Sequence, residues 1–285
     1  MKTAVSFHCP LCLSLDGDRV FQYSAPPPGE TAYSFSRDGS YSREVWRCCR
    51  CGHFVNSHEM NLEELYQGDY VNSTYGAGGI LAAFQKIMGL PPERSDNVQR
   101  VSGIISFMAG HWRGIRRLGT AVPSVLDVGS GLCVFLQRMK ENGWACTALD
   151  PDPRAVEHAQ RTVGIQAICG DFLAVDSIGS YDLIAFNKVL EHVPDSVAML
   201  GASAGHLNPN GIVYVEVPDG EMAALEGQDR EEFFVDHRVV FSMASLCLLA
   251  VRAGFTALMT QRVHDPSGKY TLRAFLTAVM KRDLS

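Results

Sequence analysis

The chain has 285 residues, of which 46% are hydrophobic and 20% are charged. This composition excludes a disordered or fibrous protein and predicts one large α/β domain, or a medium domain with a small appendage. The net charge of −6 argues against a nucleic-acid backbone or an anionic membrane as the partner. The longest apolar stretch, Ala244 to Val251, is too short to span a bilayer, and the N-terminus lacks a secretory pattern, so we expect a cytoplasmic protein.

Five of the nine cysteines fall within the first 51 residues. Four of them form two Cys-x-x-Cys pairs, Cys9 with Cys12 and Cys48 with Cys51. Two thiolates with this spacing can turn onto one ion, and two such pairs complete the closed tetrahedral site of a structural Zn²⁺. A redox dithiol is the alternative, but it would leave the second pair without a role. We therefore predict a four-cysteine zinc-binding module over residues 1–60, in which Cys49 is a spare thiol.

The predicted module is more suited to a structural role than to gripping nucleic acid. Residues 1–60 contain six Lys or Arg and six Asp or Glu, so they lack the basic surface that nucleic acid requires. A region this small also needs a metal to compensate for its small core. Turn signals at residues 25–29 and 37–40 predict a hairpin between the two cysteine pairs. The remaining cysteines lie in apolar contexts that predict burial: Cys133, Cys146, Cys169 and Cys247.

Residues 61–120 are predicted to form a helical connector. Leu62, Leu65 and Tyr66 suggest a short helix. Apolar residues at helical spacing follow Ser95, whose hydroxyl suits a helix N-cap, and they predict a longer helix that reaches Leu118.

Strand-like segments alternate with helical ones after Pro123, which is typical of a parallel sheet covered by helices. Ligands of such sheets bind beyond the carboxyl ends of the strands. The predicted strands are Ser124 to Val128, Ala145 to Leu149, Gln166 to Cys169, Asp182 to Asn187, Ile212 to Val217, Ala257 to Arg262 and Ala274 to Met280.

A glycine turn follows the first of these strands, as Asp127-Val-Gly129-Ser-Gly131. The dinucleotide pattern Gly-x-Gly-x-x-Gly is not met, because Val134 stands where the third glycine would be. Asp127 would repel a pyrophosphate but would favour an ammonium group. The turn therefore favours a cationic cofactor over a nicotinamide dinucleotide.

With this turn, the chain resembles the class I S-adenosylmethionine-dependent methyltransferases from about Pro123 to Arg282. The resemblance implies a Rossmann-like sheet of seven strands over residues 121–285, with a small zinc-binding domain before it. It also implies that Asp150, which lies 21 residues after Gly129, accepts the ribose hydroxyls, and that Asp171 reads the adenine amino group. The full implied set of cofactor-binding residues is Asp127, Gly129, Gly131, Asp150, Pro151, Asp171, Phe172 and Asn187. The alternative for each aspartate is a helix cap or a solvated strand end.

An insertion after the fifth predicted strand carries the candidate base. Together with the cysteine pairs, its His237, followed four residues later by Phe-Ser, resembles the zinc-containing sugar C-methyltransferases of deoxysugar pathways. Their Tyr-x-Glu-His segment is matched here by Phe-Val-Asp-His over residues 234–237. The resemblance implies that His237 is the general base and that Asp236 orients it. Because the tyrosine is replaced by Phe234, O- or N-methylation of a sugar, glycan or small metabolite also stays open.

Competing interpretations remain for the base and for the function. His237 could be a packed loop histidine, and Glu191 with His192 is a rival pair for catalysis or metal binding. Adjacent residues on a helix point about 100° apart, which argues against a joint role for this pair unless the backbone there is irregular. The first function is methyl transfer from S-adenosylmethionine to a small-molecule acceptor. The alternatives are an RNA or protein methyltransferase that uses the zinc module for recognition, and a non-catalytic binding protein with the same fold.

Overall fold

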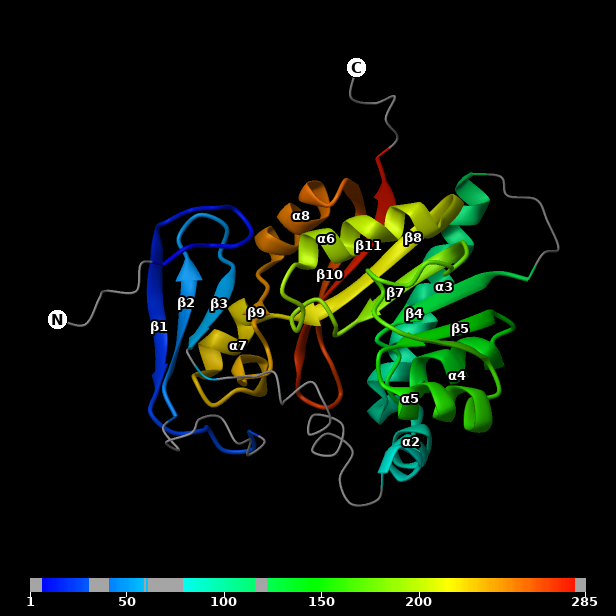
Figure 1. The fold of residues 1–285 in the computed structure, drawn as a ribbon, viewed down its shortest axis with the longest axis horizontal. Helices are drawn as coiled ribbons and strands as arrows, with labels where there is room; N and C mark the ends of the chain where they lie inside the picture. Colours follow the sequence, from blue (N-terminus) through cyan, green and yellow to red (C-terminus); the bar gives the residue numbers. More distant parts are fainter. Residues whose placement is uncertain (1–6, 31–40, 59, 61–78, 116–121, 280–285) are drawn as a thin grey trace.

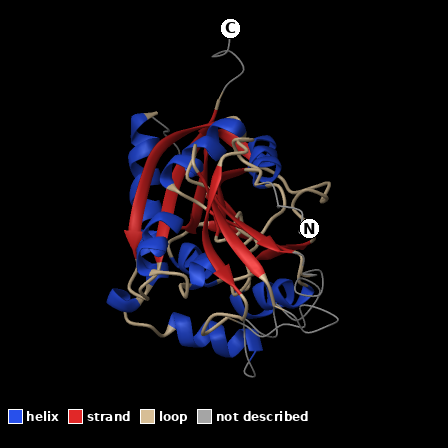
Figure 2. Cartoon of the chain, turned by 90° about the vertical axis from the view of Figure 1, so that its left-hand side faces the viewer, coloured by secondary structure: helices blue, strands red, loops and turns tan. Residues whose placement is uncertain are grey.

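The computed structural model describes residues 7–30, 41–58, 60, 79–115 and 122–279. They form a seven-stranded sheet with helices on both of its faces, and a smaller four-stranded sheet at one end of the molecule (Figures 1 and 2). The predicted helix near Leu62 and the end of the helix predicted to reach Leu118 lie outside the described residues.

The large sheet has the order β10-β11-β8-β7-β4-β5-β6. The neighbouring pairs from β8 to β6 are parallel, and β11 is antiparallel to both β8 and β10. The predicted Rossmann-like seven-stranded fold is therefore confirmed, although its last three strands in chain order begin two to five residues earlier than predicted. The strands are β4 (Ser124–Val128), β5 (Ala145–Asp150), β6 (Gln166–Cys169), β7 (Tyr181–Asn187), β8 (Leu207–Pro218), β10 (Phe255–His264) and β11 (Tyr270–Ala278).

Alternation along the central strands builds a separate core on each face of the sheet. In β7, Leu183 and Ala185 pack in one core, while Ile184 and Phe186 pack in the other. The first core also contains residues of α3 and α4, and the second contains residues of α6 and α8. The helices are α2 (Gly79–Met88), α3 (Asp96–Gly114), α4 (Val134–Glu141), α5 (Pro153–His158), α6 (Ser196–Ala202), α7 (Gly220–Glu226) and α8 (Met243–Arg252). The predicted N-cap of α3 is confirmed, since the Ser95 hydroxyl accepts a hydrogen bond from the Val98 amide.

The small sheet joins the N-terminal strands to the insertion that follows β8. Its order is β1-β2-β3-β9, and each neighbouring pair is antiparallel. The predicted hairpin between the cysteine pairs corresponds to β1 and β2. β9 comes from the insertion and pairs Val239 with Val55 and Val240 with Phe54. The strands are β1 (Gly17–Tyr23), β2 (Arg43–Cys48), β3 (Phe54–His58) and β9 (Val239–Val240). The N-terminal strands β1 to β3 therefore share one sheet with β9, which begins two residues after His237.

The expected burial of the remaining cysteines is only partly confirmed. Cys133 and Cys146 are buried and Cys247 is half-buried, but Cys169 is exposed because it lies on β6, the edge strand of the large sheet. Among the described residues, no helix has both the length and the apolar character that a membrane span requires.

Candidate active site

A cavity of about 710 Å³ opens at the carboxyl ends of the parallel strands. Six of the predicted cofactor-binding residues line it: Gly129, Gly131, Asp150, Pro151, Asp171 and Phe172. The other two, Asp127 and Asn187, are not among its lining residues. This position matches the expected ligand site of a parallel sheet.

The glycine turn brings the backbone close to the cavity. Gly129 has a φ of 70°, and a Cβ at this position would lie 2.8 Å from Cγ2 of Val189. The amide of Gly131 donates to Oδ2 of Asp150 at 2.8 Å, and the amide of Asp152 donates to Oδ1 at 2.9 Å. The Asp150 carboxylate is therefore held at the cavity wall by two backbone donors.

Asp127 and Asn187 form a pair at the ends of the central strands. The Asn187 amide donates to Oδ1 of Asp127 at 2.7 Å, and Asp127 is almost fully buried. Burial raises the pKa of Asp127 to about 7, although the Asn187 hydrogen bond opposes this rise. Burial also raises the pKa of Asp150. A cation bound nearby would oppose both effects by favouring the ionised carboxylates.

The turn after β6, the neighbour of β5, contributes Asp171 and Phe172 to the cavity. Phe172 is buried and lies edge-on to Phe186, with ring centroids 5.8 Å apart. Oδ1 of Asp171 accepts a hydrogen bond from the Leu173 amide at 2.9 Å. An apolar ring beside a carboxylate on a fixed turn is suited to a flat, amine-bearing base.

Two cationic residues at the cavity were missed by the sequence analysis. Lys188 follows β7 with a φ of 58°, which is uncommon for a residue other than glycine, and its amide donates to the Glu216 carbonyl. Arg238 follows His237, and its amide donates to the Glu191 carbonyl. Only its place next to His237 could have pointed to Arg238 in the sequence. The sequence does not show that the loop of Arg238 meets the loop after β7.

Glu191, His192 and His237 form one group beside the cavity, and one ligand atom from each lies within 4.8 Å of the others. The backbone here has the irregularity that a joint role requires, because Glu191 and His192 lie in a turn after β7 and not in a helix. Nδ1 of His192 donates to the Asp236 carbonyl at 2.9 Å, and Nδ1 of His237 donates to the Glu232 carbonyl at 2.8 Å. In each neutral ring, Nε2 then carries the lone pair. The group could therefore share a proton or hold a divalent cation.

Glu191 is the buried acidic member of this group. It is fully buried, and neither of its carboxylate oxygens has a hydrogen-bond partner among the described residues. Burial raises its pKa to about 7, while the nearby His192 and Lys188 oppose this rise. A buried carboxylate without a hydrogen-bond partner is costly, so its position beside two imidazoles favours a functional role.

The orientation of His237 comes from the backbone of its own loop. Its Nδ1 is bonded to the Glu232 carbonyl, whereas Asp236 contributes its backbone carbonyl to His192. The role of the Asp236 carboxylate in orienting His237 stays a prediction.

A buried ionic network lies behind the site and was also missed by the sequence analysis. Glu216, near the end of β8, accepts two hydrogen bonds from Arg100 and one from Arg273. The Tyr214 hydroxyl donates to the same carboxylate at 2.6 Å. Burial alone would raise the pKa of Glu216, but Arg100 and Arg273 hold it well below its usual range. The network ties α3 to β8 and β11.

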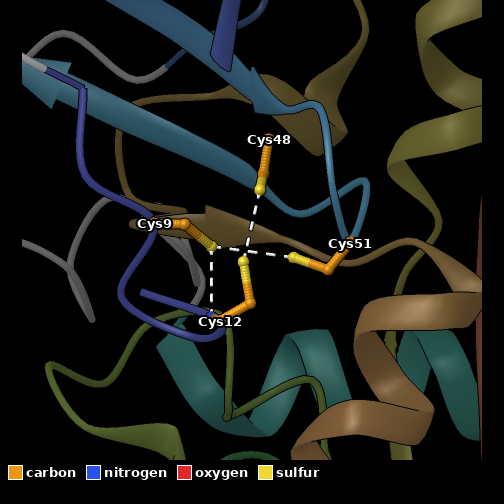
Figure 3. A group of neighbouring side chains, drawn as sticks. All are labelled: Cys9, Cys12, Cys48 and Cys51. Carbon is orange, nitrogen blue, oxygen red and sulfur yellow. Dashed lines mark hydrogen bonds between the residues drawn. The ribbon is translucent and has the colours of Figure 1, made fainter. Parts of the chain in front are cut away.

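The four predicted zinc ligands come together in the N-terminal part (Figure 3). Sγ of Cys9 lies 3.6 Å from Sγ of Cys51, and Sγ of Cys12 lies 3.4 Å from Sγ of Cys48. A tetrahedral ion with Zn–S bonds of about 2.3 Å would place its sulfurs roughly 3.8 Å apart, so the four thiols fit Zn²⁺ after a small outward movement.

The local backbone also suits a metal knuckle. The amide of Gly52, at a φ of 68°, donates to the Cys48 carbonyl and closes the second turn. Burial alone would raise the pKa of Cys48, but the amides of Cys51 and Arg50 lower it to about 7, whereas burial raises the pKa of Cys9 to about 11 and also raises that of Cys51. Cys49 points elsewhere, because it is exposed and its thiol lies 3.5 Å from Asp18.

A family model described as a methyltransferase domain matches residues 94–260, which is more than half of the chain. The chain belongs to this family. The match contains the glycine turn, the cavity and the segment with His237.

Curated relatives agree with this family over part of their length. A ubiquinone biosynthesis O-methyltransferase of Xanthomonas axonopodis pv. citri is 32% identical over 116 residues, which are 38% of this chain and 48% of that protein. A homologue with the same description in Xanthomonas oryzae pv. oryzae is 34% identical over 117 residues. The chain thus spans about half the length of the curated relatives that it matches.

Solved structures share the fold. The 1,6-didemethyltoxoflavin-N1-methyltransferase of Burkholderia thailandensis, solved with S-adenosylhomocysteine, has a TM-score of 0.54 and 20% identity, over 90% of this chain and all of that one. The magnesium protoporphyrin IX methyltransferase of Synechocystis PCC 6803 has a TM-score of 0.53 and 16% identity, over 76% of this chain and all of that one.

Proposed function

We propose that the protein transfers the methyl group of S-adenosylmethionine to a small-molecule acceptor, a sugar or glycan-related metabolite. One observation carries this proposal: the cavity at the glycine turn is bordered by His192, which lies beside His237. The family match and the fold shared with methyltransferases support it. The location is proposed to be cytoplasmic.

The cavity residues fit this cofactor in the order in which the strands present them. Asp150 would accept the ribose hydroxyls, and Asp171 with Phe172 would hold the adenine. Asp127, under the glycine turn, would favour the cationic methionine end by charge. When bound, S-adenosylmethionine supplies a methyl group that is already activated as a sulfonium.

The residues of this chain would then remove a proton from the acceptor and exclude water. The Nε2 lone pair of His237 would accept the proton, because Nδ1 is committed to the Glu232 carbonyl. The imidazolium that forms would face the buried carboxylate of Glu191, whose ionised form would stabilise the new charge. Asp236 is proposed to assist in the orientation of His237.

The group of four cysteines is proposed to hold a structural Zn²⁺. The four sulfurs come from two turns and would fill all four positions of a tetrahedral ion, which leaves no open position for catalysis. Its role would be to fix the N-terminal sheet against the insertion.

Methyl transfer to a panel of sugar nucleotides and phenolic metabolites, followed with radiolabelled S-adenosylmethionine, tests the proposed function. We expect turnover of a small acceptor and a large loss of kcat in His237→Gln. His264→Gln, an exposed histidine at the end of β10, is the matched control and should retain wild-type turnover. Transfer to bulk RNA or protein without any small acceptor would contradict the proposal, and so would full kcat in His237→Gln.

A further inference from the structure

Residues in the N-terminal part of the chain form hydrogen bonds with the backbone of the loop that carries His237. Arg43 donates to the Phe233 carbonyl at 2.7 Å, and Glu30 accepts from the Val235 amide at 2.7 Å. Arg43 and Glu30 are themselves joined in a buried ion pair. These contacts reach the loop from residues that are distant in the sequence and that contribute nothing to the cavity wall.

Asn56 makes the contacts nearest to His237. Its side-chain amide donates to the His237 carbonyl at 3.2 Å and to the Phe234 carbonyl at 3.3 Å. Its backbone amide donates to the Arg238 carbonyl at 3.0 Å. One residue of β3 therefore binds the main chain at His237 and on both sides of it.

Asn56 is itself fixed on two sides. Its strand pairs with β2, where it lies opposite Val45, and the preceding residue Val55 pairs with Val239 of β9. Its side-chain oxygen accepts a hydrogen bond from Arg43 at 3.4 Å, which sets the orientation of the amide so that its nitrogen faces the loop. The pairing of β3 within the sheet and the Arg43 hydrogen bond therefore hold Asn56 in the position from which it binds the loop.

We propose that Asn56 is a positioning residue for His237, which places the N-terminal sheet within the catalytic machinery. The inference rests on the proposed function, in which His237 accepts the acceptor's proton. Asn56 fixes the carbonyl of His237, while the Glu232 carbonyl fixes its ring. Loss of the first contact would let the loop shift, and a shift of about 1 Å can cost about a hundredfold in rate. The cofactor end of the cavity should be much less affected, because the residues proposed to hold the cofactor lie at the ends of β4, β5 and β6 and not on this loop.

The test compares Asn56→Leu, which removes both side-chain donors at similar volume, with Asn142→Leu. Asn142 also donates its side-chain amide to a backbone carbonyl, but at the exposed end of α4. Two readouts are needed: the imidazole nitrogen and ring-proton NMR signals of His237 in the S-adenosylhomocysteine complex of the full chain, and steady-state kinetics with the acceptor found for the wild type.

For Asn56→Leu we expect displaced His237 signals with loss of the Nδ1-protonated tautomer, kcat lower by tenfold or more, and S-adenosylhomocysteine affinity within twofold of wild type. Asn142→Leu should match the wild type in all three. Asn56→Asp keeps the shape but replaces the donors by an acceptor, so it should reproduce the effect if Asn56→Leu does not fold. Unchanged His237 signals and kcat in the folded variants would overturn the inference. Displaced signals together with full turnover by His237→Gln would instead retain the positioning and overturn the proposed function.

Discussion

The centroids of the imidazole rings of His192 and His237 lie 4.8 Å apart, although the two residues follow different strands of the large sheet. Each ring donates its Nδ1 hydrogen to a backbone carbonyl, so both are held in defined orientations. The buried Glu191 completes the group. The proposed base is therefore one member of a small acid–base cluster, and the rival pair considered from the sequence belongs to the same cluster.

The raised pKa of Glu191 predicts a pH-dependent difference in stability between the wild type and Glu191→Gln. In the folded protein, burial raises this pKa from 4.5 to about 7. As pH rises from 4.5 to 7, the unfolded chain releases this proton before the folded chain does, so the wild type loses stability. Glutamine cannot ionise. The variant should therefore gain up to about 3 kcal/mol relative to the wild type between pH 5 and 8, measured by urea unfolding.

Glu157→Gln is the control for this experiment, because Glu157 is exposed on α5. Its stability relative to the wild type is measured over the same pH range for comparison. A flat difference for Glu191→Gln would show that Glu191 titrates normally in the folded protein.

Replacement of Asp150 should weaken cofactor binding. Asp150→Ala removes the acceptor of the Gly131 and Asp152 amides and the carboxylate proposed for the ribose. Since hydrogen bonds to a charged group contribute about 1.5–3 kcal/mol, affinity for S-adenosylhomocysteine should fall by about tenfold to a hundredfold. Calorimetry measures this loss, with Glu157→Gln as a variant that should bind normally. Equal affinities of Asp150→Ala and the wild type would exclude the proposed ribose contact.

The cysteines offer an internal comparison for the zinc site. Wild-type protein should contain about one zinc per chain, Cys48→Ser should contain much less, and Cys49→Ser should match the wild type because Cys49 points away from the cluster. Elemental analysis gives the zinc content, and thermal unfolding should show a lower midpoint for Cys48→Ser alone. Zinc-free wild-type protein with an unchanged midpoint would refute the structural zinc.

The Glu216 network should dominate the stability of the sheet near the cavity. Arg100→Leu leaves the buried Glu216 carboxylate with fewer donors, and breaking such a buried pair costs about 3–5 kcal/mol. Arg161→Leu breaks an exposed ion pair with Glu157 and should cost less than about 1 kcal/mol. Denaturant unfolding of both variants compares the two costs, and similar values would mean that the network contributes little.

The sequence predicted the large sheet well because its strands carry a strong apolar pattern and its glycine turn has a distinctive spacing. The zinc site could be predicted because the two cysteines of each Cys-x-x-Cys pair lie close together in the sequence. In contrast, β9 has only two residues, so no periodicity could reveal that it joins the N-terminal sheet.

The site contacts that the sequence missed are long-range. Glu191 and His237 lie on loops after different strands, and only the folded chain shows that they meet. The hydrogen bond from Asn56 to the His237 carbonyl depends on the pairing of β3 with β9. A helix was assumed around Glu191 and His192, whereas the chain forms a turn there, which changes the direction of both side chains.

Calorimetric titration of the full chain with S-adenosylmethionine tests the central claim most directly. We predict saturable binding at one site per chain, in roughly the micromolar to millimolar range typical of enzyme substrates, and markedly weaker binding by Asp150→Ala. A wild-type protein that is folded but shows no binding of S-adenosylmethionine or S-adenosylhomocysteine would contradict the proposed methyl transfer.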